Sequence, residues 1–125
     1  MSLGPLIVAS VLMLALGVAS LWVARRAAAG TLPRNDLVGI RTAATRASDA
    51  AWIAAHRAGA ADLRWIGVVA LVTAVLIWPT LGMPEGAREI ALAVVVLGGA
   101  ALVLVFSLRA AVVGGRAARA VTDGD

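Results

Sequence analysis

The chain has 125 residues, of which 62% are hydrophobic, and its mean hydropathy is +0.96. Soluble domains are about half apolar, so this excess indicates a protein that resides in a lipid bilayer. The net charge of +4 does not indicate a nucleic-acid partner, because the arginines stand beside apolar stretches, where membrane orientation requires them. The chain has no cysteine, which excludes disulfides and thiolate metal ligands.

Three apolar segments are long enough, or nearly so, to cross a bilayer. They cover residues 3–24, 65–81 and 90–108. A helical span needs roughly 20 apolar residues, and a helix satisfies its own backbone hydrogen bonds in lipid. The sequence therefore predicts an all-α integral membrane protein with three transmembrane helices, in which residues 1–125 form a single membrane domain.

The first segment could also be a cleaved signal peptide. No positive charge precedes its apolar run, however, and Arg25 and Arg26 follow it. Both features favour a retained membrane anchor.

The polar segment between the first two spans divides into irregular chain and helix. Residues 30–39 contain the glycine, proline and asparagine typical of loops, whereas the alanine-rich sequence from about Thr45 favours helix. We expect Thr45 to cap this helix and Asp49 to lie near its positive dipole end. At about 100° per residue, five residues of the helix fall on one narrow face. They are Thr45, Trp52, His56, Gly59 and Leu63, and they form the predicted stripe.

A neighbouring face of the same helix is mostly basic. It carries Arg46, Ile53, Arg57 and Arg64. The sequence therefore predicts an amphipathic cytoplasmic helix between spans one and two, running directly into span two. It would either lie flat at the membrane surface or fold back against the spans.

The remaining connections are short. Residues 81–86, LGMPEG, predict a tight turn between spans two and three. Gly98 to Ala101 would allow a close helix approach in span three, or they reflect the composition alone. Residues 114–125 lack apolar periodicity and are predicted to form a flexible tail.

The arginines are distributed unevenly along the chain. The loop between the first two spans holds seven of them, the second connection holds Arg88, and the segment after span three holds Arg109, Arg116 and Arg119. By the positive-inside rule, the long loop and the C-terminus lie in the cytoplasm and the N-terminus lies outside.

The polar segment offers little for catalysis and more for binding. With one histidine, no cysteine and few carboxylates, it provides no metal cluster and no nucleophile with a base, so we expect no enzyme activity, metal or cofactor. Trp52 and His56 are one helical turn apart and can stack. Arg41 could join them, reach Asp49 or bind a lipid phosphate. Alternatively, these side chains only hydrogen-bond one another and fasten the loop to the spans.

The order of residues here resembles a known family signature. It reads Pro-x-Asn-x3-Gly-Ile-Arg-Thr-x2-Thr-x6-Trp-x3-His-Arg-x-Gly, which is similar to the SdpI family of bacterial membrane proteins. The matching positions are Asn35, Gly39, Ile40, Arg41, Thr42, Thr45, Trp52, His56, Arg57 and Gly59. The chain departs from the family at Ala43-Ala44, where Pro-Trp is frequent, and at Arg34, which separates Pro33 from Asn35.

The resemblance implies a short-form, multi-pass protein of the bacterial cytoplasmic membrane that confers immunity to a membrane-active peptide toxin. It implies a binding cluster made of Asn35, Gly39, Arg41, Thr42, Thr45, Trp52, His56 and Arg57, with membrane lipid and a peptide toxin as partners. An alternative of another class is a small accessory subunit of a larger membrane complex. Three Ala- and Gly-rich helices bury little surface alone, which also allows a homo-oligomer.

Overall fold

The computed structural model describes residues 2–124. Its elements are the helices α1 (Gly4–Ala29), α2 (Asp49–Leu76) and α3 (Glu85–Asp123), with a short 3-10 helix, η1 (Trp78–Gly82), between the last two. Three stretches are long and apolar enough to cross a membrane: Gly4–Ala29, Asp49–Gly82 and Glu85–Asp123. The prediction of an all-α protein with three membrane-spanning helices is confirmed.

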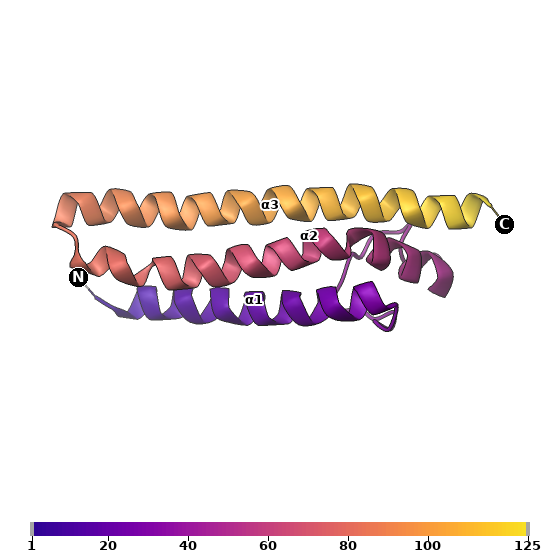
Figure 1. Ribbon diagram of the computed structural model, residues 1–125, viewed down its shortest axis with the longest axis horizontal. Helices are drawn as coiled ribbons and strands as arrows, with labels where there is room; N and C mark the ends of the chain where they lie inside the picture. Colours follow the sequence, from indigo (N-terminus) through magenta and orange to yellow (C-terminus); the bar gives the residue numbers. More distant parts are fainter. Residues whose placement is uncertain (1, 125) are drawn as a thin grey trace.

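Helix α2 lies between α1 and α3 and packs against both (Figure 1). Within residues 2–124, no Cα atom of α1 comes within 8 Å of one in α3. Glycines allow the close approach of α1 to α2, because a Cβ built on Gly17 would lie 3.1 Å from the Gly67 carbonyl oxygen. On the other side of α2, Gly99 packs against the Thr73 side chain, whereas a Cβ built on Gly98 would meet no side chain or neighbouring helix within 4 Å.

Helix α1 begins and ends at residues suited to those positions. Pro5 lies in its first turn, where a missing N–H costs nothing because no helical carbonyl is available to it. At the other end, Gly30 has a φ of 71°, and its N–H donates to the Ala27 carbonyl at 3.2 Å. This left-handed conformation favours glycine, and it turns the chain out of the helix toward the polar loop.

Ser48, and not Thr45, caps α2. The Ser48 Oγ accepts a hydrogen bond from the Ala51 N–H at 3.0 Å, and Asp49 lies in the first turn as expected. The expectation for Thr45 is wrong because its hydroxyl is committed to the preceding loop, where it donates to the Ile40 carbonyl at 2.6 Å.

The predicted amphipathic segment is the first part of α2, and no break separates it from the second apolar stretch. With 28 residues, α2 is about 42 Å long, so it exceeds the hydrocarbon core of about 30 Å. The predicted stripe is buried inside the protein at Trp52, His56, Gly59 and Leu63. A separate helix lying flat on the membrane is therefore not formed, and the segment folds back against its neighbours.

The prediction of a flexible tail from residue 114 is wrong for the described residues. Helix α3 has 39 residues and continues to Asp123; residue 125 lies outside the described part. Gly114 and Ala118 are buried, and a Cβ built on Gly114 would lie 3.3 Å from the Ala55 carbonyl oxygen. Glycine weakens a helix by about 0.5–1 kcal/mol, but here it allows α3 to pack closely on α2, which offsets that cost.

The predicted turn between spans two and three is present. Pro79 lies in η1, where its ring and missing N–H prevent α2 from continuing. The Thr80 hydroxyl donates to the Ile77 carbonyl at 2.5 Å. Helix α3 begins directly after Pro84, so the connection is short and the two helices are antiparallel neighbours.

Candidate functional site

Residues 33–38 form a tight loop around the side chain of Asn35. Its Oδ1 accepts the N–H groups of Leu37 and Val38, both at 2.8 Å. Its Nδ2 donates to the carbonyls of Pro33 at 2.9 Å and Val38 at 3.2 Å. Both halves of the amide are therefore used within one loop. Aspartate could replace the acceptor but not the two donors, which explains why this position needs asparagine.

Gly39 brings the loop against the aromatic residues of α2. It has a φ of 111°, a region that residues with a Cβ rarely adopt. A Cβ built there would lie 2.5 Å from His56 Nε2 and 3.2 Å from the Trp52 ring. Glycine is thus required for both its backbone conformation and its lack of a side chain.

Trp52 and His56 stack as the sequence predicts. Their ring centroids are 4.1 Å apart with an interplanar angle of 32°, and each residue is 1% exposed. The Trp52 Nε1–H donates to the Leu32 carbonyl at 2.9 Å, and the Ile40 N–H donates to His56 Nε2 at 2.8 Å. The pair therefore holds the loop at two points, one at each end of the segment 32–40.

These contacts fix the tautomer of His56. Its Nε2 faces a backbone N–H, which can only donate, so this nitrogen must be unprotonated. Its Nδ1 lies 2.8 Å from the Trp52 carbonyl, which can only accept, so Nδ1 carries the hydrogen. The imidazole is a neutral, structural group.

Thr42 and Thr45 close the loop on itself. The Thr45 Oγ1 accepts the Thr42 N–H at 3.0 Å, and the Thr42 Oγ1 accepts the Thr45 N–H at 3.2 Å. Thr45 is fully buried, so its hydroxyl needs these partners. The two threonines thereby hold the residues between Gly39 and α2 in one compact turn.

Arg41 does not join Trp52 and His56. Its side chain is exposed, while the two aromatic rings are buried. Neither of the ion pairs in residues 2–124 involves it. The three residues expected in one cluster are therefore not brought together, because the turn at Gly39 directs the next side chains alternately inward, at Ile40, and outward, at Arg41.

Arg57 lies over the end of α1. A Cβ built on Gly30 would be 2.5 Å from a guanidinium nitrogen of Arg57, so the charge sits beside the C-terminal carbonyls of that helix. A cation is stabilised there by the helix dipole. Arg34, the residue inserted before Asn35, has its Nε 3.3 Å from the Asp49 carboxylate.

Two contacts of this region are absent from the predictions made from the sequence. The Arg109 Nε lies 3.6 Å from an Asp62 carboxylate oxygen, and the Asp62 side chain is 8% exposed. The Ile40 side chain inserts between α2 and α3, since a Cβ on Gly59 or Gly114 would meet its Cδ1. A signal for Asp62 was present: it follows Gly59 by three residues and so continues the buried stripe. Ile40 belongs to the family signature, but no periodicity in the sequence predicts that its side chain lies between two helices.

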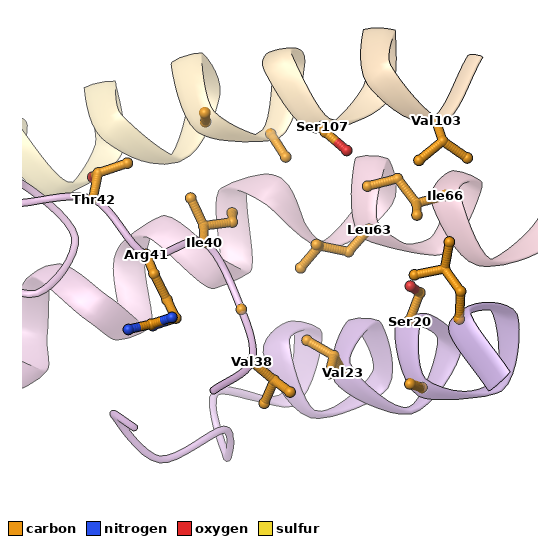
Figure 2. A pocket seen from close by; sticks show the side chains of 15 residues that line it. Ser20, Val23, Val38, Ile40, Arg41, Thr42, Leu63, Ile66, Val103 and Ser107 are labelled. Atoms are coloured by element: carbon orange, nitrogen blue, oxygen red, sulfur yellow. The ribbon is translucent and has the colours of Figure 1, made fainter. Parts of the chain in front are cut away.

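Beside the loop lies a cleft of about 460 Å³ between α1 and α3, with α2 at its base. Its walls are largely apolar and include Val23, Ile66 and Val103. Figure 2 shows Arg41 and Thr42 near one end and Ser20 and Val103 near the other. The cleft exists because α1 and α3 both contact α2 without packing on each other.

The side chains that line the cleft determine what kind of ligand it could hold. Within residues 2–124, no three side chains of His, Cys, Asp or Glu gather closely enough to hold a metal ion. The cleft offers apolar walls, two serine hydroxyls, and the exposed guanidinium of Arg41. Such a site suits a largely apolar ligand that carries one negative group.

A comparison of the chain with known protein families finds a match over this region. The model of the SdpI/YfhL protein family matches residues 31–113, from the start of the loop to the part of α3 that packs on it. The chain belongs to the SdpI/YfhL protein family. No curated protein and no solved structure matches it.

The signature residues of this SdpI/YfhL chain fall into two groups. Most are used in building the loop and fastening it to α2, through the hydrogen bonds and close contacts described above: Asn35, Gly39, Thr42, Thr45, Trp52, His56, Arg57 and Gly59. Arg41 alone is exposed beside the cleft without a carboxylate partner in residues 2–124. In this chain the signature residues therefore build a compact, hydrogen-bonded loop that leaves Arg41 exposed.

Proposed function

We propose that this membrane protein confers immunity or resistance on a bacterium, by binding a membrane-active peptide toxin before it damages the cytoplasmic membrane. Its role is then binding and not catalysis. The observation that carries the proposal is the cleft of about 460 Å³ whose rim is formed by the signature loop, Val38 to Thr42. Membership of the SdpI/YfhL family supports it.

The chemistry of the cleft fits part of an amphipathic peptide. Its volume is within the range of ligand-binding pockets, and apolar side chains of the peptide would pack on Val23, Ile66 and Val103. A carboxylate of the peptide would pair with Arg41, whose planar guanidinium can bind it in a bidentate manner. A peptide held in this way is withdrawn from the assembly that permeabilises the bilayer.

The orientation expected from the arginines also predicts where the cleft lies relative to the membrane. With the long loop in the cytoplasm and the N-terminus outside, Arg41 would lie at the cytoplasmic edge of the membrane. The cleft would then receive a peptide that has already entered the bilayer. In this proposal the protein binds the toxin within the membrane, after the toxin has entered the bilayer.

The test is a toxin challenge of cells that lack the gene, complemented by matched variants. Ser107→Leu fills the cleft, whereas Ala101→Leu adds the same side chain at an exposed position of α3 outside it. Arg41→Ala removes the charge at the rim, whereas Arg116→Ala removes an exposed charge elsewhere on α3. We expect the two cleft variants to lose protection at normal membrane levels and the two controls to keep it.

Two results would contradict the proposal. Cells without the gene could be as resistant as wild-type cells to every secreted peptide from related strains. Alternatively, Ser107→Leu and Arg41→Ala could protect as well as the wild type, which would show that the cleft has no part in immunity.

A second candidate function is that of an accessory subunit in a larger membrane complex. The observation in its favour is α3, whose most apolar stretch leaves large side chains such as Ile90, Val94 and Leu97 exposed. A partner helix or a second copy could cover that face as well as lipid does. This candidate is tested by purifying the protein in mild detergent and identifying the proteins that remain bound to it. The gene neighbourhood is a second test: a neighbouring toxin-maturation gene would favour immunity, and a transport or respiratory operon would favour the accessory subunit.

A further inference from the structure

A second pocket, of about 360 Å³, lies between α1 and α2 and receives no residue from α3. Its floor consists of alanines, which leave space between the helices where larger side chains would fill it. Two arginines from different helices border this floor. The lining includes Arg25, Arg64, Ala24, Ala28, Ala60 and Ala61.

Both arginines lack a carboxylate partner in residues 2–124. The ion pairs there join Arg34 to Asp49 and Arg109 to Asp62, and no acidic residue lines the pocket. Arg25 and Arg64 are both exposed. Two positive charges therefore border the pocket, and no acidic side chain of the protein neutralises them. An anion bound in the pocket would reduce the repulsion between the two arginines.

The two arginines occupy the same depth relative to the membrane. Arg25 directly follows the first apolar run, and Arg64 directly precedes the second. Helices α1 and α2 are neighbours connected by the polar loop, so both arginines lie where the hydrocarbon core ends. Lipid phosphates are located at this level, and basic pockets between transmembrane helices bind anionic lipid headgroups.

We propose that this pocket binds the headgroup of an anionic phospholipid, with its phosphate between Arg25 and Arg64. Guanidinium groups bind phosphate through two parallel hydrogen bonds, and the alanine floor leaves room for the headgroup. The acyl chains then follow the apolar surface of α1 and α2 into the bilayer. This site is separate from the cleft at Arg41 and does not depend on the proposed immunity function.

The test measures lipid binding to the full-length chain in a neutral detergent. Phosphatidylglycerol and phosphatidylcholine with the same acyl chains are titrated, and bound lipid is counted by native mass spectrometry. The variant R25A/R64A is compared with R116A/R119A, which removes two exposed charges from α3 and none from the pocket. We expect preferred binding of phosphatidylglycerol, a loss of affinity of about tenfold or more in R25A/R64A, and a change within about twofold in the control.

Further measurements distinguish a specific lipid site from a general attraction between positive charge and any anion. The conservative variant R25K/R64K keeps the charges that set orientation but lacks the guanidinium geometry, so we expect it to retain charge preference with reduced affinity. Inorganic phosphate alone should compete weakly. The proposal is overturned if both lipids bind equally, if R116A/R119A loses as much affinity as R25A/R64A, or if inorganic phosphate displaces the lipid at similar concentration. Should R25A/R64A fail to fold, the comparison of R25K/R64K with wild type decides.

Discussion

Replacing His56 by alanine should destabilise the protein through one identifiable group. The Ile40 N–H is buried and donates to His56 Nε2 at 2.8 Å, and alanine leaves it without that acceptor. An unsatisfied buried donor costs about 1–3 kcal/mol. The lost ring contact with Trp52, at 4.1 Å between centroids, adds about 0.5–1.5 kcal/mol. We therefore expect the free energy of unfolding to fall by about 1.5–4.5 kcal/mol.

The measurement is reversible unfolding in mixed detergent micelles, followed by circular dichroism as the denaturing detergent is increased. His56→Gln is the matched control, because its side-chain oxygen can accept the Ile40 N–H while the aromatic contact is lost. We expect it to recover part of the difference. A loss below about 1 kcal/mol in His56→Ala would refute the reasoning, since it would show that the loop does not depend on this hydrogen bond.

Two further predictions concern the same region and its orientation. Gly39→Ala should lower the free energy of unfolding by about 1–3 kcal/mol, because of its φ of 111° and its contact with His56, whereas Gly86→Ala, which meets no atom within 4 Å, should leave it nearly unchanged in the same assay. In this chain without native cysteine, a cysteine at Ala43 should resist an impermeant thiol reagent in intact cells and one at Gly86 should react, whereas the reverse labelling would overturn the predicted orientation.

The number of spans and the Trp52–His56 pair could be predicted because simple physics determines them. Lipid requires long apolar helices, and helical geometry places residues four apart on one face. Neither inference depends on how the rest of the chain folds. The loop is different, because the direction of Arg41 depends on the backbone turn at Gly39, which no periodicity reveals.

The tail was mispredicted because its stability depends on tertiary contacts. Gly114 and Gly115 weaken helix formation locally, and the sequence alone gives no reason to continue α3 past them. In the fold, Ala118 packs on Ala51 and Ala55 of α2, and this burial favours the helix. The pairing of Asp62 with Arg109 also depends on the alignment of α2 with α3, which only the complete packing sets.

The central place of α2 has a consequence for the order of assembly during synthesis. Because α1 and α3 each pack on α2 and not on one another, a hairpin of α1 and α2 can form before α3 leaves the ribosome. The loop can already bond to Trp52 and His56 at that stage. The Ile40 side chain, however, lacks its contact with Gly114 until α3 arrives. The loop is therefore fully packed only after α3 has folded onto α2. In a nascent chain truncated before Gly114, the Ile40 side chain should be exposed.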